Sequence, residues 1–325
     1  MDNKIWAVLM YLSDSQWSPK KESLKFDDNF WDVFLGKCRE TGINMVVLDV
    51  GDGVNYKSHP EIAMKDGWSK ERVHSEVEKC KKLGIELIPK LNFSSGHSYW
   101  MGDYRRMTST KPYYDFCSDV IKEVYEIFDG PRFIHLGLDE ECYITSRVTD
   151  YVLYRQGQLL IDDIKFLVNE TNKTGALAWM WHDPVTEAVE EFTEAIAPDE
   201  VIISPWWYWA YTNERPYKLI TDWENMYANR GITCEQDVPI RVNFLKNILP
   251  LMEKGYRYIP TPSNCFKVEG NTEETIAYFK NGSPTDEQIL GFMTAPWRHT
   301  LPENREAIYE SLELLKAARE KHYGK

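Results

Sequence analysis

Short apolar runs, rich in β-branched and aromatic residues, alternate along the chain with longer amphipathic stretches. The runs have the length of buried strands, and the stretches between them carry apolar residues at the three- and four-residue spacing of helices. Alternation of this kind predicts parallel βαβ units, and eight units without a leftover element predict an α/β fold, a closed (β/α)8 barrel. The eight runs are Ile5–Leu12, Ile43–Val50, Ile85–Phe93, Arg132–Leu138, Ala176–Trp181, Val201–Trp207, Tyr256–Pro262 and Ile289–Pro296.

Three of the predicted helices have recognisable ends. They cover Asp27–Glu40, Ser69–Leu83 and Tyr114–Phe128, and each is closely followed by a glycine, the residue that most often ends a helix. No linker, charge block or longer repeat divides the chain, so we expect one catalytic barrel over residues 1–325 without a separate accessory domain. The longest irregular connection, Asn213–Pro239, is expected to be an elaborated loop on the functional face.

Composition narrows the classes of partner. The net charge is −13, whereas nucleic acids and anionic membranes are bound by basic surfaces, so neither is expected as a partner. No apolar run approaches the roughly 20 residues that span a bilayer, so no membrane insertion is expected. The first residues lack the basic start and apolar stretch of a signal peptide. This indicates the cytoplasm, or the periplasm or exterior if a leader has been removed. The six cysteines form no C-x-x-C pair and are interpreted as buried free thiols.

In a barrel of this type, catalytic groups lie at the C-terminal ends of the strands. The fourth predicted strand continues into Gly137-Leu138-Asp139-Glu140. Strand alternation directs His135, Gly137 and Asp139 toward the barrel axis, and the loop brings Glu140 to the same space. Two carboxylates this close supply what glycoside cleavage needs, an acid for the leaving oxygen and an anion for the developing positive charge. We therefore interpret Glu140 as a general acid assisted by Asp139.

The second and third predicted strands bring further polar groups to the same end. Alternation directs Lys90 and Asn92 inward, and His97 follows in a small polar loop. His97 either hydrogen-bonds a carboxylate or a sugar hydroxyl, or is simply exposed. Asp49, at the end of the second strand, either supports the site from below or forms a structural salt bridge.

Aromatic residues are concentrated where the fifth, sixth and eighth predicted strands end. Flat aromatic faces complement the C–H faces of pyranose rings, and indole N–H groups can bond to hydroxyls. Some of these rings are expected to be barrel core, one of each alternate pair, and the rest to bind sugar. The candidates are Trp179, Trp181, Trp206, Trp207, Tyr208, Trp209 and Trp297.

These residues resemble glycoside hydrolase family 20, the β-N-acetylhexosaminidases. The run from His135 to Glu140 is similar to that family's H-x-G-x-D-E motif, and the segment from Ile88 through Ser98 to its P-E-[IL]-D-x-P-G-H-S segment. The resemblance implies hydrolysis of terminal β-linked N-acetylhexosamine in an oligosaccharide or glycoconjugate, with no cofactor and no metal. It also implies a retaining, substrate-assisted mechanism, a recognised exception to the two-carboxylate scheme.

On this resemblance, Glu140 protonates the glycosidic oxygen and later deprotonates water, while Asp139 orients the substrate's 2-acetamido group and stabilises the oxazolinium ion. The remaining implied contacts are Asn92, His97 and His135 around the acid, and Trp179, Trp181, Trp206, Trp207, Tyr208 and Trp297 in the sugar pocket.

The chain also departs from the family pattern. The first strand ends in Ser13-Asp14 where the family usually has an arginine, and Lys90 and Asn92 replace an acidic pair. The expected tyrosine after the seventh strand is absent, and Tyr208 or Tyr211 is the candidate to replace it.

Three alternatives remain at this level. The first is a related hydrolase acting on a sugar without an N-acetyl group, with Asp49 or Asp183 as nucleophile. The second is a non-catalytic carbohydrate-binding barrel. The third is a metal-dependent hydrolase, although no H-x-H or H-x-x-x-H spacing supports it. The sequence leaves the sugar epimer, the linkage, exo or endo action and the oligomeric state open. The candidate metal ligands are His97, His135, His182, His299 and Glu140.

Overall fold

A computed structural model describes residues 4–15, 22–141, 150–208, 248 and 250–324. In this part of the chain, eight parallel strands form one sheet in the order β7-β6-β5-β4-β3-β2-β1-β8. A parallel bridge between Tyr258 and Ile289 joins the two ends of that order, so the sheet curls into a nearly closed barrel. The strands are β1 (Ile5–Tyr11), β2 (Met45–Asp49), β3 (Glu86–Lys90), β4 (Phe133–His135), β5 (Leu177–Trp181), β6 (Val201–Ser204), β7 (Arg257–Tyr258) and β8 (Gly291–Thr294).

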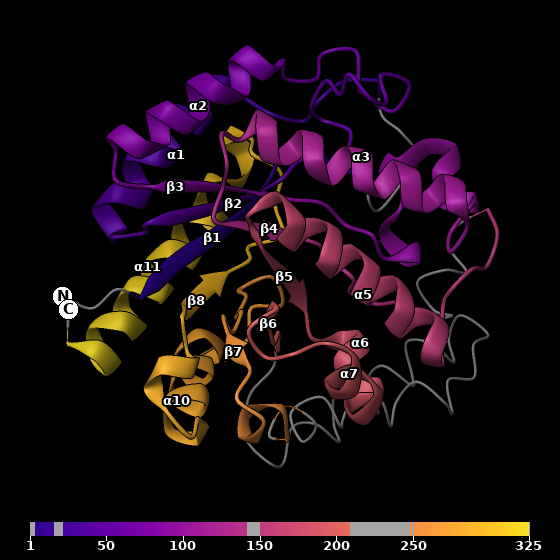
Figure 1. Cartoon of the computed structure of the whole chain (residues 1–325). Coiled ribbons are helices and arrows are strands. Elements are labelled where there is room, and N and C mark those ends of the chain that lie inside the picture. Colours follow the sequence, from indigo (N-terminus) through magenta and orange to yellow (C-terminus); the bar gives the residue numbers. More distant parts are fainter. Residues whose placement is uncertain (1–3, 16–21, 142–149, 209–247, 249, 325) are drawn as a thin grey trace, which may run out of the picture.

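Helices follow the strands and surround the sheet (Figure 1). The predicted (β/α)8 barrel is therefore confirmed, and each of the eight predicted apolar runs contains one strand. The helices are α1 (Asp28–Thr41), α2 (Lys70–Lys82), α3 (Lys111–Ile127), α5 (Gly157–Thr174), α6 (Asp183–Glu187), α7 (Val189–Ala195), α10 (Asn271–Gly282) and α11 (Arg305–Tyr323), with short 3-10 helices at Ser95–His97, Tyr99–Arg106, Asp286–Gln288 and Pro302–Asn304.

Local sequence explains where these helices begin and end. The Asp27 side chain accepts a hydrogen bond from the Phe30 N–H at the start of α1, and Gly42 ends that helix in the left-handed conformation. Ser69 caps α2 in the same way. Among the described helices, none combines the length and the apolar character needed to cross a bilayer.

All eight strands are shorter than their predicted runs, and for two of them the local sequence gives the reason. The fourth was predicted over Arg132–Leu138, but β4 ends at His135 because Gly137 and Leu138 have left-handed φ values of 69° and 70°. The seventh was predicted over Tyr256–Pro262, but β7 covers only Arg257–Tyr258. Prolines at positions 260 and 262 cannot donate ladder hydrogen bonds there.

The core has two layers separated by the sheet. Along β1, Trp6, Val8 and Met10 belong to the outer layer under the helices, whereas Ala7 and Leu9 belong to the layer inside the barrel. Side chains that alternate between two buried faces account for the nearly continuous apolar runs that identified the strands.

The cysteines are mostly as predicted. Cys38, Cys80 and Cys117 are buried free thiols, whereas Cys265 is only half-buried. Cys142 and Cys234 lie outside the described residues.

The contact between β1 and β8 is tight at Gly291. A Cβ atom on this residue would lie 1.9 Å from the Ile5 carbonyl oxygen, which is backbone and cannot rotate away. We expect Gly291→Ala to lower the free energy of unfolding by about 2 kcal/mol or more, because strands must separate to admit the methyl group. Urea unfolding measures the change.

The matched control is Gly36→Ala in α1, where a Cβ would meet nothing within 4 Å. Alanine there is expected to raise stability by up to about 1 kcal/mol, since glycine is a poor helix former. Equal stability of the two variants would contradict this account of the contact between β1 and β8.

Candidate active site

The turn after β4 carries the predicted acidic pair in an unusual backbone conformation. Gly137, Leu138 and Glu140 have φ values of 69°, 70° and 52°. Such values cost energy for residues with a Cβ and persist only where surrounding contacts hold them. Glycine is required at position 137, because a Cβ there would lie 2.3 Å from the Asn92 side-chain oxygen. The turn therefore depends on its contact with the loop after β3.

Asn92 supplies that contact. Its Nδ2 donates to Asp139 Oδ1 at 2.7 Å, and its Oδ1 accepts from the N–H groups of Ser94 and Leu138, each at 3.1 Å. Asn92 is 1% exposed. One buried amide thus fixes both the rotamer of Asp139 and the backbone next to it.

His97 lies between the two carboxylates. Its Nε2 is 3.5 Å from Asp139 Oδ2 and 3.5 Å from Glu140 Oε2. The side chain of His97 is 1% exposed, compared with 8% for Asp139 and 20% for Glu140. His97 is therefore not an exposed loop residue, and Glu140 is the member of this group that solvent reaches best.

The pKa of His97 reflects these neighbours. Burial lowers the pKa, but the charges of Asp139 and Glu140 outweigh burial and raise it above the usual value of 6.5. The imidazolium form is thus favoured beside the two carboxylates.

Asp183 adds a third carboxyl group at the start of α6. Its Oδ1 accepts from the Glu140 N–H at 3.3 Å, and its Oδ2 accepts from Trp206 Nε1 at 2.7 Å. Burial raises the pKa of Asp183 well above its usual range, and the charges of Asp139 and Glu140 raise it further. Asp183 connects the acidic turn to the aromatic residues after β6.

Below this turn, the otherwise apolar barrel interior contains an ion pair. Asp49 and Lys90 form a buried ion pair, 3% and 0% exposed. The structure thus contains the salt bridge that was one of the two interpretations of Asp49. Burial raises the pKa of Asp49, although Lys90 opposes the shift.

His135 is fully buried beside β5. Its Nδ1 accepts from the Gly137 N–H at 3.0 Å, and its ring centroid lies 5.0 Å from that of Trp179 and 4.7 Å from that of Trp181. Burial and, secondarily, Lys90 hold its pKa well below the usual value, so the ring is neutral. His135 therefore supports the acidic turn from below.

The predicted aromatic candidates among the described residues share one apolar cluster inside the barrel, against which Trp297 packs. Trp179 and Trp181 are fully buried in the barrel interior, and Trp179 Nε1 donates to Ser204 Oγ at 2.7 Å. Both members of this alternate pair are thus covered by protein, as are Trp206 and Tyr208. Trp207 is buried, and its carbonyl oxygen accepts from Asn271 Nδ2 at 2.8 Å.

Three of these rings form a chain of contacts that begins at Asp183, to which Trp206 Nε1 donates. Trp206 stacks on Tyr208 with centroids 5.0 Å apart, and Tyr208 meets Trp297 edge-on at 6.3 Å. Trp297 in turn lies 6.0 Å from Trp181. The rings thus contact one another in a continuous path from Asp183 toward the end of β8. Trp209, Tyr211 and the loop predicted over Asn213–Pro239 lie outside the described residues.

At the ends of β1 and β8, Asp14 pairs with His299, whose Nε2 lies 2.8 Å from Asp14 Oδ2. Burial raises the pKa of Asp14, but His299 and Lys25 outweigh it and lower the pKa. No group of three or more His, Cys, Asp or Glu side chains in the described ranges could hold a metal ion. The metal-dependent alternative thus lacks a ligand set in that part of the chain.

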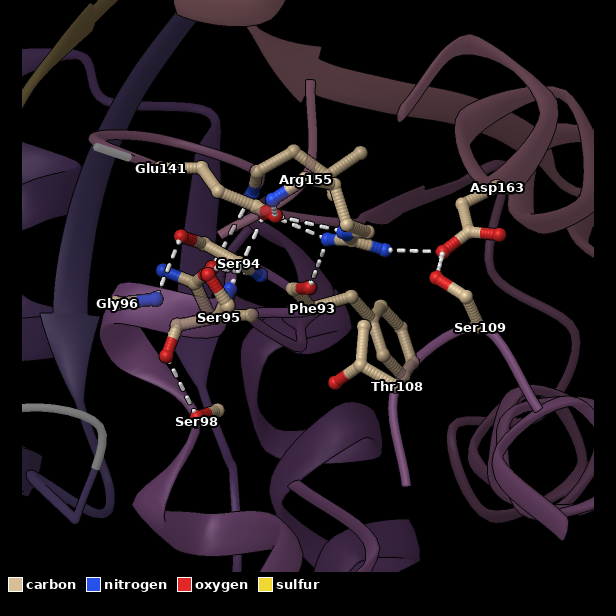
Figure 2. A network of polar contacts seen from close by, with 12 residues as sticks. Phe93, Ser94, Ser95, Gly96, Ser98, Thr108, Ser109, Glu141, Arg155 and Asp163 are labelled. Atoms are coloured by element: carbon tan, nitrogen blue, oxygen red, sulfur yellow. Dashed lines mark hydrogen bonds and ion pairs between the residues drawn. The ribbon is translucent and has the colours of Figure 1, made fainter. Parts of the chain in front are cut away.

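Sequence reasoning did not identify a buried ion-pair network beside the acids. Figure 2 shows Glu141 facing Arg155, which also reaches Asp163. The Arg155 side chain is 2% exposed, and those of Glu141 and Asp163 are 3% and 0% exposed. The sequence does contain one indication of this network, because Glu141 directly follows Asp139 and Glu140. A buried carboxylate requires a charged partner, so a third acidic residue at this point indicates a cation nearby.

This geometry defines a (β/α)8 barrel with an acidic pair after β4 and a histidine from the loop after β3. No family model matches the sequence, and no curated protein matches it. Solved structures do match. Dispersin B has a TM-score of 0.59 at 16% identity, over 97% of this chain and 98% of that one.

Two further solved structures match this chain at similar levels. The tandem family 20 catalytic modules of the pneumococcal exo-β-D-N-acetylglucosaminidase StrH have a TM-score of 0.61 at 13% identity, over 99% of this chain and 84% of that one. A mutant Streptomyces plicatus β-hexosaminidase in complex with its product GlcNAc has a TM-score of 0.63 at 12% identity, over 98% of this chain and 68% of that one. In fold, the chain is thus similar to family 20 catalytic barrels.

The raised pKa of His97 makes a prediction about stability. A histidine whose pKa is raised by folding contributes stability that is complete below the unfolded value of about 6.5 and is lost as pH rises through the folded pKa. The stability that His97→Gln removes is therefore expected to be larger at about pH 5.5 than at about pH 9. Urea unfolding of both proteins at each pH measures this, and a difference that grows with pH would contradict the assignment.

Proposed function

We propose that this protein is a family-20-like glycoside hydrolase that cleaves terminal β-linked N-acetylhexosamine with retention, using Glu140 as general acid and base. The observation that carries the proposal is the position of His97 Nε2, 3.5 Å from both Asp139 and Glu140 at the C-terminal end of β4. Catalytic groups of such barrels lie at this end. The likeness in fold to β-N-acetylhexosaminidases supports the same reaction class.

In this mechanism, Glu140 protonates the glycosidic oxygen as the bond to the sugar breaks. Its side chain is more exposed than those of Asp139 and His97, so it can reach a bound substrate. The carboxylate formed then removes a proton from the water that attacks the oxazolinium ion, and Glu140 returns to its starting state.

Asp139 orients the substrate's acetamido group. Its Oδ1 is occupied by Asn92 Nδ2. Its Oδ2 faces His97. A carboxylate held in this way can accept the acetamido N–H and stabilise the positive charge of the oxazolinium ion, because it does not need to reorganise during the reaction.

The other carboxylates support a mechanism without a protein nucleophile. Asp49 is committed to Lys90 inside the barrel. Asp183 is buried, accepts from Glu140 N–H and Trp206, and has a raised pKa that favours its protonated form. A protonated carboxyl is a poor nucleophile. These features favour the substrate's own acetamido oxygen over the alternative of a sugar without an N-acetyl group.

The path of rings formed by Trp206, Tyr208 and Trp297 is the proposed wall of the sugar pocket. Its connection to Asp183 through Trp206 Nε1 places an apolar face next to the acids. Such a face can stack on a pyranose ring while Glu140 meets the glycosidic oxygen.

The acid role is tested with chromogenic β-N-acetylglucosaminide and β-N-acetylgalactosaminide beside the plain glucoside and galactoside. We expect the wild type to hydrolyse only N-acetyl substrates, and Glu140→Gln to lower kcat by about 100-fold to 10,000-fold. The loss should be larger for a disaccharide than for a nitrophenyl glycoside, because a poor leaving group depends more on protonation. No hydrolysis of any substrate by the folded wild type would overturn the proposal.

Acetamido participation is tested with a series of substrates whose N-acetyl group carries zero to three fluorine atoms. Fluorine withdraws electrons from the carbonyl oxygen, so kcat/KM is expected to fall steadily along the series. Asp139→Asn should lower kcat on the parent substrate, because it removes the charge that balances the oxazolinium ion. Rates independent of fluorination would favour a protein nucleophile instead.

A further inference from the structure

Glu140 and Glu141 are neighbours in the chain but their carboxylates have different surroundings. Glu140 faces His97, whereas Glu141 is buried against Arg155. The left-handed backbone at Glu140, with a φ of 52°, accompanies this divergence of the two side chains. The Glu141 carboxylate is therefore paired with Arg155 and is not part of the group formed by Glu140, Asp139 and His97.

Arg155 makes a nearly complete set of bonds to this carboxylate. Its backbone N–H and its Nε donate to Glu141 Oε1 at 2.8 Å and 2.6 Å, and its Nη2 donates to Glu141 Oε2 at 2.6 Å. Nη1 donates to Asp163 Oδ2 at 2.9 Å, which anchors the guanidinium to α5. Figure 2 shows this chain of contacts from Glu141 to Asp163.

The same contacts join the loops that follow β3 and β4. Glu141 Oε2 also accepts the Ser95 N–H at 3.1 Å, two residues before His97. Arg155 Nη2 also donates to the Phe93 carbonyl oxygen at 2.8 Å. The ion pair of Glu141 and Arg155 therefore contacts the chain just before His97, and Glu141 itself directly follows Glu140.

We propose that Glu141 and Arg155 are positioning residues, which hold the loop of His97 against the turn of Glu140 so that His97 stays within reach of both Asp139 and Glu140. This inference rests on the proposed function of Glu140. Neither residue contacts the reacting atoms in this scheme. Their effect is geometric, since displacement of a catalytic group by about 1 Å can cost roughly 100-fold in rate.

A purely structural role is the competing explanation, and variants that retain charge or shape separate the two. Arg155→Lys keeps the charge but loses the paired bonds to Glu141 and the link to Phe93. Glu141→Gln keeps the shape but loses the charge. The matched control is Glu76→Gln in α2, a carboxylate that is 2% exposed, lies 3.0 Å from Arg72 Nε and accepts from Trp31 Nε1.

We expect Glu141→Gln and Arg155→Lys to lower kcat by about 10-fold to 100-fold with KM nearly unchanged, while Glu76→Gln leaves kcat within about twofold. Thermal unfolding is measured for all three, so that a loss of rate can be compared at equal loss of stability. Equal effects of the three variants on kcat would overturn the inference.

A second readout does not require activity. The pKa of His97 is measured by NMR titration of its ring protons, assigned with His97→Gln. It should fall in Glu141→Gln and Arg155→Lys as His97 moves away from Asp139 and Glu140, and stay unchanged in Glu76→Gln. If the wild type hydrolyses none of the sugars, the proposed function fails and this shift alone decides on positioning. An unchanged His97 pKa in both folded variants overturns the inference.

Discussion

The arrangement of the site depends on one buried amide. Asn92 holds the turn after β4 through its oxygen and Asp139 through its nitrogen. Leu138 and Glu140 adopt left-handed conformations that an isolated chain disfavours, so this turn needs such external contacts. Gly137 leaves the space that Asn92 occupies. The strand β4 can end early, and the acids can leave the strand direction, because the neighbouring loop supplies the missing bonds.

Two buried ion pairs lie near this contact. The ion pair of Asp49 and Lys90 lies inside the barrel, and the pair of Glu141 and Arg155 lies beside the turn. Asp49 and Glu141 therefore each have a cationic partner outside the reacting group. Asp139 and Glu140 are left to share His97. A site with several acids can thus keep two of them available for a substrate.

The barrel could be predicted from the sequence because both faces of each strand are buried and the helices between them keep a regular period. The position of the acidic pair could be predicted because the ends of parallel strands meet at one edge, whereas the sequence left open whether His97 is buried beside the acids or exposed. The partners of Glu141 and Asp183 could not be predicted from the sequence. Their bonds join loops whose backbone has no period, and Arg155 stands in a segment with no helix or strand pattern. Residue type also could not show that Trp179 lies inside the barrel whereas Trp206 bonds to Asp183, because both are buried tryptophans near strand ends.

The pairing of β1 with β8 has a consequence for folding during synthesis. Ile5 N–H donates to the carbonyl oxygen of Leu290, and β1 pairs with β8 from Ile5↔Gly291 onward. While a ribosome is still making the chain, β1 has a free edge until the last strand emerges. Unpaired edges of this kind invite association with other chains. Of the strands in this barrel, β1 is therefore the one that waits longest for its second neighbour.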